Sequence, residues 1–289
     1  WSAGRRCTGA RCAQFSCRRM ARIVFALGWS DFILKYRGSV LGYLWSFLGP
    51  LVQFVVILTV FRPFLGGTIA QYPLYLFLGL IIWEHFHLTT SACIAVLYDK
   101  MGMMQKIAFP KILLPLSVGW THLVIFLTRF AIFLVFAVLL GVRPEWSWVY
   151  AIIILLNMTL FALGVGMGIS AFAVKFRDVP HLWGIALQIL FWLTPILYPA
   201  LNAGPVMREL NLLLSNSFSF TLAAVLTTFI RFQPLSLILY DARRALLYAD
   251  TLGVPTAVHL AGLTVICFAF FLIGAILFTR RSRYFVQEY

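Results

Sequence analysis

Residues 147–173 read SWVYAIIILLNMTLFALGVGMGISAFA and contain no Asp, Glu, Lys or Arg. A helix of this length is about 40 Å long, which exceeds the roughly 30 Å hydrocarbon core of a bilayer. Comparable apolar runs recur along the chain. They predict an all-α integral membrane protein with six membrane-spanning helices, near 44–64, 72–97, 112–140, 147–173, 181–200 and 255–279.

The overall composition agrees with this fold class. Hydrophobic residues make up 62% of the 289 residues and charged residues only 11%, whereas an average soluble domain is about 25% charged. The net charge of +14 comes from basic residues in the gaps between apolar runs and at the two ends. Anionic lipid headgroups are therefore the expected partner of these charges, and nucleic acid is not.

Basic residues also predict the orientation. With six spans and a cytoplasmic N-terminus, sixteen Lys and Arg residues fall on the inner side and six on the outer side, as the positive-inside rule requires. Arg129 is left inside a span. The polar stretch 210–230 is the alternative seventh span, but that span would move the basic C-terminal end outside. We therefore expect both termini in the cytoplasm and re-entrant or gate helices in an outer gate region, 201–250.

The N-terminal part divides into two segments. Residues 1–19 show no apolar period, so we expect an atypical leader, disordered or non-native, and place the membrane domain at 20–289. Residues 22–37 mix apolar and charged positions and predict an amphipathic helix in the inner membrane interface. Lys35 and Arg37 on that helix are candidates for contact with the phosphates of a lipid substrate.

A short cytoplasmic segment separates the second and third spans. In 97–111, Leu97, Met101, Met104 and Ile107 fall on one helical face. An apolar face that carries methionines is suited to the groove of a partner protein.

Three stretches of sequence resemble a known family. They are SDFILKYRGSVLGYLWSFLGPLVQFVVILTVF (30–61), MGMMQKIAFPKILLPLS (101–117) and KFRDVPHLWGIALQILFWLTPILYP (175–199). Together they resemble the membrane subunit of polysaccharide-exporting ABC transporters of the ABC-2 type, the permeases of O-antigen, capsule or teichoic acid. The resemblance covers 22 to about 200, resumes at QPLSLILYDARRALL (233–247), and is interrupted by an apparent insertion at 215–232.

The resemblance implies partners and a location. The subunit would form a homodimer that joins two ATP-binding cassette subunits in the bacterial cytoplasmic membrane and exports a glycan on a polyprenyl-diphosphate carrier. The segment 97–109 would be the coupling helix that contacts the ATPase through Asp99, Met101, Met104, Gln105, Ile107 and Phe109. The chain itself contains no Gly-Lys dipeptide and hence no P-loop. No enzymatic activity and no cofactor are expected in this chain, because the partner would bind ATP and Mg²⁺.

Side chains within the spans suggest further roles. Aromatic rings can pack on sugar C–H faces, and the candidate glycan-channel residues are Tyr43, Trp45, Tyr75, Trp83, Phe86, Trp192 and Tyr198. Gly164 and Gly168 form a G-x-x-x-G pattern that favours close helix packing, within the subunit or across a dimer. His85 and His87 point to different helix faces, so no metal site is expected.

Two other functions remain open at this point. An ABC-2 type exporter of a small lipid or drug would need neither an interface helix nor a wide channel. A stand-alone channel or membrane-embedded transferase would act without an ATPase, although a transferase would need clustered acids or histidines that the sequence lacks.

Overall fold

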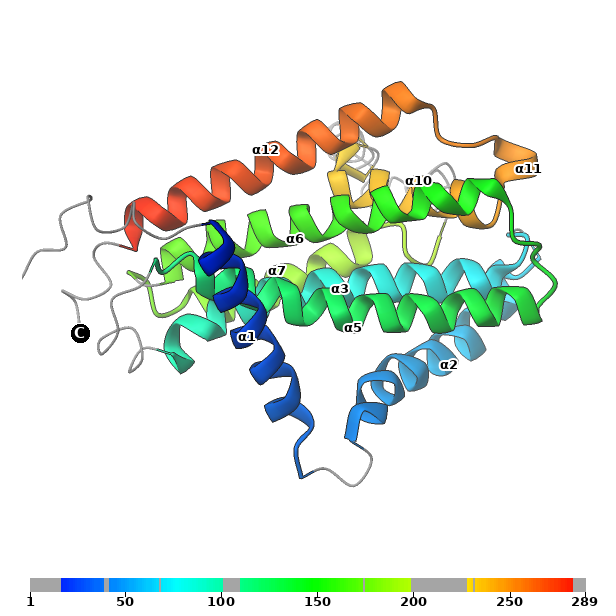
Figure 1. Cartoon of the computed structure of the whole chain (residues 1–289). Coiled ribbons are helices and arrows are strands. Elements are labelled where there is room, and N and C mark those ends of the chain that lie inside the picture. Colours follow the sequence, from blue (N-terminus) through cyan, green and yellow to red (C-terminus); the bar gives the residue numbers. More distant parts are fainter. Residues whose placement is uncertain are drawn as a thin grey trace, which may run out of the picture.

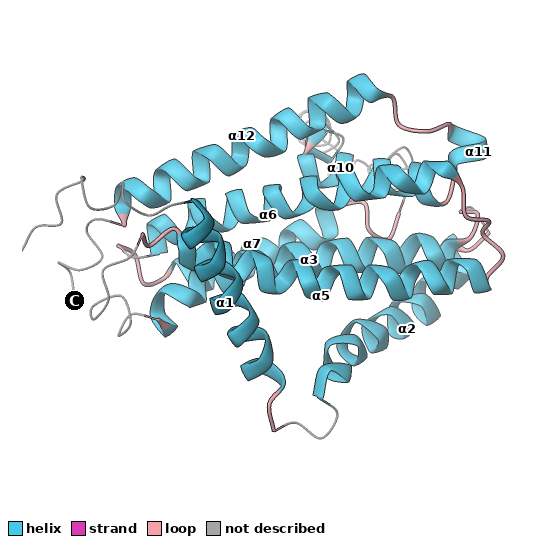
Figure 2. Cartoon of the chain, viewed as in Figure 1, coloured by secondary structure: helices cyan, strands magenta, loops and turns pink. Residues whose placement is uncertain are grey.

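The computed structural model describes residues 17–38, 42–67, 69–100, 110–173, 175–198, 228–230 and 232–282. Throughout these ranges the regular elements are helices joined by turns, without a strand (Figure 2). The elements are α1 (Cys17–Tyr36), η2 (Gly42–Leu44), α2 (Trp45–Leu65), α3 (Tyr72–Asp99), α5 (Leu113–Leu139), η3 (Trp146–Val149), α6 (Tyr150–Ala173), α7 (Val179–Leu193), α10 (Pro234–Leu246), α11 (Ala249–Leu252) and α12 (Ala257–Arg281).

Five helices are long and apolar enough to cross a membrane. They run over Gly42–Leu65, Tyr72–Asp99, Leu113–Leu139, Trp146–Ala173 and Ala257–Arg281. Each begins and ends within two residues of the predicted span. The boundaries agree because an apolar run and its polar flanks are local properties of the sequence.

The expected fifth span, 181–200, is shorter than predicted. Its helix α7 has 15 residues, or about 22 Å of helix. Thr194 is extended (ψ 135°), because the ring of the following Pro195 disfavours helical backbone in the residue before it. A six-span topology is therefore not confirmed by helix length.

The long helices α3, α5, α6 and α12 run roughly along one axis, whereas α1 and α2 splay away from them (Figure 1). Helix α1 leans on α5, and α2 touches mainly α3. Only 6% of the apolar window of α2 is buried inside this chain. Helix α2 is thus a span whose surface is left to lipid or to another protein.

Two glycines bring α6 and α12 into close contact. A Cβ atom added to Gly164 would lie 2.5 Å from the backbone carbon of Phe270, and one added to Gly274 would lie 2.0 Å from the carbonyl oxygen of Gly164. Gly168 is looser, because its nearest neighbour would be the Cα of Gly274 at 4.0 Å. The G-x-x-x-G pattern therefore packs within the subunit, and mainly through Gly164.

The bundle has two ends, which we name after α3. The Asp99 end holds the end of α3, the start of α5 and the end of α12, and the Tyr72 end holds the opposite termini (Figure 1). Helix α1 begins at Cys17 and so includes the last three residues of the expected leader. Residues 101–109 of the expected coupling helix and most of the outer gate region, 199–227, lie outside the described residues.

Candidate functional site

Two lysines on either side of residues 101–109 of the expected coupling segment contact other helices at the Asp99 end. On the N-terminal side, the Lys100 ammonium lies 2.5 Å from the carboxylate of Asp31 on α1. On the C-terminal side, the Lys111 ammonium donates to the carbonyl of Ser282, the residue after α12, at 2.5 Å. The residues on either side of 101–109 are therefore connected to α1 and to the end of α12.

Both contacts suit their positions. Lys111 meets a carbonyl at the C-terminal end of a helix, where the macrodipole favours a cation. The side chain of Asp31 is 31% exposed and that of Lys100 is 19% exposed, so this ion pair is half-buried. Sequence reasoning found neither contact, because each joins residues far apart in the chain. The one relevant feature of the sequence was the position of Lys100 and Lys111 on either side of 101–109.

Arg243 forms a buried junction at the Tyr72 end. It is only 5% exposed, and its guanidinium donates to the Tyr75 hydroxyl at 2.6 Å, the Pro195 carbonyl at 2.6 Å and the Ile196 carbonyl at 2.9 Å. The same group lies over the Tyr75 ring, 3.3 Å from its centroid. One side chain of α10 thus joins α3 to the turn that follows α7.

These acceptors of Arg243 are neutral oxygen atoms. Burial lowers the pKa of Arg243, while Tyr75 and Tyr248 favour its charged form; an arginine stays protonated in any case. Removal of the guanidinium would leave buried carbonyls without a donor, which costs about 1–3 kcal/mol each. The junction is therefore a strong constraint on where α10 sits.

Further hydrogen bonds extend this junction. Tyr75 donates to the Tyr198 carbonyl at 2.9 Å, and Tyr198 donates to the Trp192 carbonyl at 2.9 Å. Gln233, just before α10, donates to the Leu193 carbonyl at 3.3 Å. The end of α7, the turn after it and the start of α10 are therefore held as one unit.

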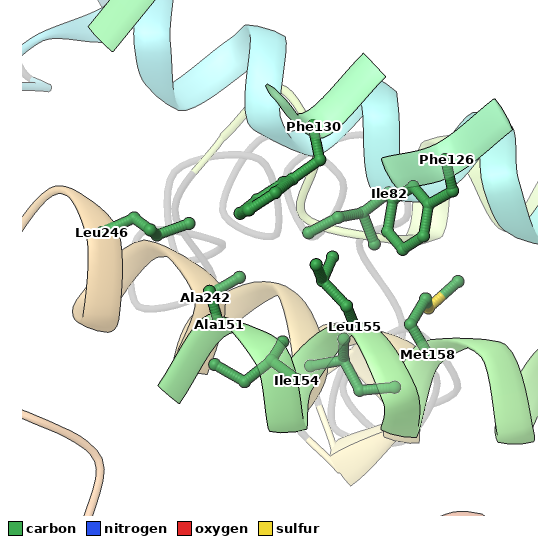
Figure 3. Close-up of a pocket in the computed structure, with 10 residues that line it drawn as sticks. Ile82, Phe126, Phe130, Ala151, Ile154, Leu155, Met158, Ala242 and Leu246 are labelled. Carbon is green, nitrogen blue, oxygen red and sulfur yellow. The ribbon is translucent and has the colours of Figure 1, made fainter. Parts of the chain in front are cut away.

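The face of α10 next to Arg243 covers an apolar pocket in the bundle (Figure 3). Ile238, Ala242 and Leu246 line it from α10, spaced four residues apart. The other lining residues come from α3, α5 and α6 and are Ile82, Phe126, Phe130, Ala151, Ile154, Leu155 and Met158. Helix α10 thus makes polar contacts through Arg243 and apolar contacts along the neighbouring face.

Arg243 is one of the six basic residues that the charge count placed on the outer side. Its spacing in the sequence nevertheless indicated that its side chain is buried. It follows Leu235 and Leu239 at four-residue intervals, and all three are buried. Arg244 lies on another face and donates to the carbonyls of Leu252, Gly253 and Val254. An arginine that extends an apolar stripe indicates a buried junction.

The candidate glycan-channel aromatics divide into two groups. Tyr75, Trp83 and Phe86 are at most 5% exposed and lie in the hydrophobic core of the chain. The structure gives these three a packing role. Tyr43 and Tyr198 are half-buried, and Trp45 and Trp192 are more than half exposed. Glycan contact stays a prediction for all seven residues.

The candidate charged residues are accessible where they are described. Lys35 and Arg37, proposed for phosphate contact, are exposed at the end of α1. Asp99, at the end of α3, is exposed as well. The other proposed coupling residues, Met101, Met104, Gln105, Ile107 and Phe109, lie outside the described residues.

With this geometry in view, comparison with protein families gives a direct match. Residues 22–214 match the family model described as ABC-2 type transporter; the range takes in α1 from Arg22 onward and the helices that follow it up to α7. The chain belongs to the ABC-2 type transporter family. Lys100 and Lys111 lie inside the matched range, whereas Arg243 lies beyond it.

Individual relatives are about 30% identical to this ABC-2 type chain over the residues that align. The O-antigen export system permease protein RfbA of Myxococcus xanthus is 32% identical over 166 residues, which cover 57% of this chain and 64% of that protein. Two proteins of the same description from Klebsiella pneumoniae are 29% identical over 169 residues, covering 58% of this chain and 65% of each. The matched stretch thus spans slightly less than two thirds of each relative.

Proposed function

We propose that this chain is the membrane subunit of an ATP-driven exporter of a lipid-linked polysaccharide, such as O-antigen, in the bacterial cytoplasmic membrane. It acts as a homodimer with two ATP-binding cassette subunits, which bind ATP and Mg²⁺. Membership of the ABC-2 type family and the similarity to three relatives named as O-antigen export permeases support this proposal.

The observation that carries the proposal is the anchoring of the coupling segment. A contact point for an ATPase can drive transport only when its movement reaches the membrane helices. Lys100 and Lys111 connect the two ends of the segment to α1 and α12. In the proposed topology the Asp99 end is cytoplasmic, the polypeptide crosses the membrane six times, and both termini lie inside. The excess of Lys and Arg on that side supports this orientation.

The exposed apolar surface of α2 supports a dimer. A single chain buries 6% of this apolar window, and six helices hardly enclose a path for a hydrated glycan. A second copy would complete the wall of the path, with the exposed aromatics Trp45 and Trp192 facing the glycan.

The proposal is tested by placing a charge on the apolar face of the coupling segment. A strain in which the gene for this chain is deleted is complemented with Met104→Asp or Ile107→Asp. Either variant should fail to restore surface glycan and should not co-purify with the ATPase. Leu252→Asp on α11, an exposed apolar residue near the opposite end, is the matched control and should leave both unchanged. Normal glycan and a bound ATPase in the Met104 and Ile107 variants would refute the assignment.

The deletion strain also separates the alternatives. If the deletion leaves surface glycan intact and a lipid or drug accumulates in the cell, the chain exports a small molecule. If the purified chain is active without any ATPase, the channel or transferase interpretation is correct.

A further inference from the structure

The ionisable residues Glu84 on α3 and Arg129 on α5 lie at a similar height along the bundle axis, near the middle of the bundle. Sixteen residues separate Leu113 from Arg129 on α5, or about 24 Å of helix, and fifteen separate Glu84 from Asp99 on α3, or about 22 Å. Both residues are thus at a similar distance from the Asp99 end, on helices that pack against each other. Charges at this depth usually mark a pathway for a polar solute.

Helix α1 brings a third charge to the same level. Its Gly28 packs on α5 and accepts a hydrogen bond from Thr121 at 2.9 Å. Lys35 and Thr128 lie two turns beyond Gly28 and Thr121, respectively, on the same faces. The Tyr43 hydroxyl, just beyond α1, donates to Thr128 at 2.7 Å, so the chain beyond Lys35 stays close to α5.

The electrostatic interactions of Lys35 agree with this placement. Burial and then the positive charge of Arg129 lower the pKa of the Lys35 ammonium, while the negative charge of Glu84 raises it. Lys35 of α1 and the buried Arg129 of α5 therefore belong to one cluster with Glu84. Lys35 and Arg129 bring two positive charges to this cluster and Glu84 brings one negative charge.

The imidazole of His122 completes the cluster. His122 is seven residues before Arg129 and on the same face of α5, and the charges of both Lys35 and Arg129 act on it. Its Nδ1 is buried without a hydrogen-bond partner among the described residues. By contrast, His85 on α3 contacts Thr159 at 3.2 Å and stacks on Phe126. His122 thus provides a ring nitrogen whose hydrogen bond is not used within the described structure.

We propose that Lys35, His122 and Arg129 form a binding site for a phosphate-bearing lipid headgroup within the membrane, with Glu84 as its internal counter-ion. Two cations attract a phosphate group, and His122 is placed to hydrogen-bond to it. Glu84 offsets part of the positive charge when the site is empty, and the incoming phosphate displaces that interaction. The identity of the lipid, a polyprenyl diphosphate, rests on the proposed function.

The site is tested by native mass spectrometry of the full-length chain purified from membranes with its associated subunits. The probes are undecaprenyl diphosphate, undecaprenol, which lacks phosphate, and phosphatidylglycerol, an ordinary phospholipid. We expect undecaprenyl diphosphate to bind at least about tenfold more tightly than undecaprenol. Equally tight phosphatidylglycerol binding would support the site and assign it to membrane phospholipid.

The substitutions are expected to change undecaprenyl diphosphate binding in opposite directions. Lys35→Gln and Arg129→Gln should each weaken undecaprenyl diphosphate binding about tenfold, the loss of one charge-assisted contact. Glu84→Gln should strengthen it, which a merely structural role would not do. Arg22→Gln, an exposed arginine near the start of α1, is the matched control and should bind as the wild type does.

Unchanged undecaprenyl diphosphate binding in Lys35→Gln overturns the proposal. If Arg129→Gln does not fold because the residue is buried, Arg129→Lys tests whether a positive charge at that position is sufficient for lipid binding. This test also fails separately from the proposed function. If the variants lose lipid binding but the deletion strain keeps its surface glycan, the lipid site is correct and the proposed export of a glycan is wrong. If the deletion removes the glycan but Lys35→Gln binds normally, only the site is wrong.

Discussion

The imidazole Nδ1 of His259 on α12 lies 3.1 Å from the Oδ2 atom of Asp241 on α10. The Asp241 side chain is fully buried, and its Oδ1 atom has no hydrogen-bond partner among the described residues. Burial raises the pKa of Asp241, while His259 and then Arg244 lower it, and the net direction is upward.

The raised pKa predicts a pH dependence of stability. The folded state holds the Asp241 proton more tightly than the unfolded state, so this contribution to stability is lost as pH rises from about 4 through the raised pKa. Asp241→Asn cannot titrate. The melting temperature of the wild type should therefore fall relative to that of the variant as pH rises. Asp250→Asn is the control, and a pH-independent difference for Asp241→Asn would contradict the prediction.

Gly79 leaves room for the Arg243 guanidinium. A Cβ atom at this position would lie 2.8 Å from Nη2 of Arg243 and 3.2 Å from the Ile196 side chain. Gly79→Ala should lower the free energy of unfolding by about 1–3 kcal/mol, as overpacking of a core does, measured as a lower melting temperature. Gly184→Ala on α7 meets no atom within 4 Å and should be neutral or slightly stabilising. Equal effects of the two substitutions would refute the close packing at Gly79.

Substitutions of Gly164 and Gly168 on α6 are expected to differ in their effect on stability. Gly164→Ala places a methyl group against the backbone of α12 and should separate the helices, lowering the melting temperature of the purified protein by several degrees. Gly168→Ala adds the same methyl group where the nearest atom is 4.0 Å away, so it should have little effect. A reversed order would show that α6 meets α12 in another register.

The ion pair between Asp31 and Lys100 should matter for coupling. In the proposed complex, Asp31→Asn should leave ATP hydrolysis measurable but reduce the glycan exported per ATP, because α1 no longer follows the coupling segment. The exchange Asp31→Lys with Lys100→Asp should restore export. The matched control is Asp178→Asn, an exposed aspartate just before α7. An unchanged ratio of export to hydrolysis in Asp31→Asn would show that the ion pair is not used.

The long helices could be predicted because the length of an apolar run and its flanks determine a span locally. The direction in which each side chain points could not. Every residue from Leu74 to Trp83 on α3 is buried, and an apolar helix has no polar face that would reveal which aromatics meet solvent or substrate. The burial of Tyr75, Trp83 and Phe86 inside the chain could therefore not be predicted.

The polar junctions escaped prediction for a related reason. Arg243 and Tyr75 are far apart in sequence, and counting charges treats a buried arginine as an exposed one. The shortness of α7 had a local cause in Pro195, but the apolar residues around it concealed the break. Positions of charges along the chain thus predict topology better than they predict contacts.

The lysines on either side of 101–109 give this part of the chain two separate attachments. One is to α1, through Asp31, and the other is to Ser282, the residue after α12. In the proposed complex, a force that the ATPase applies to 101–109 would therefore act on two helices at once, although these helices are far apart in the sequence.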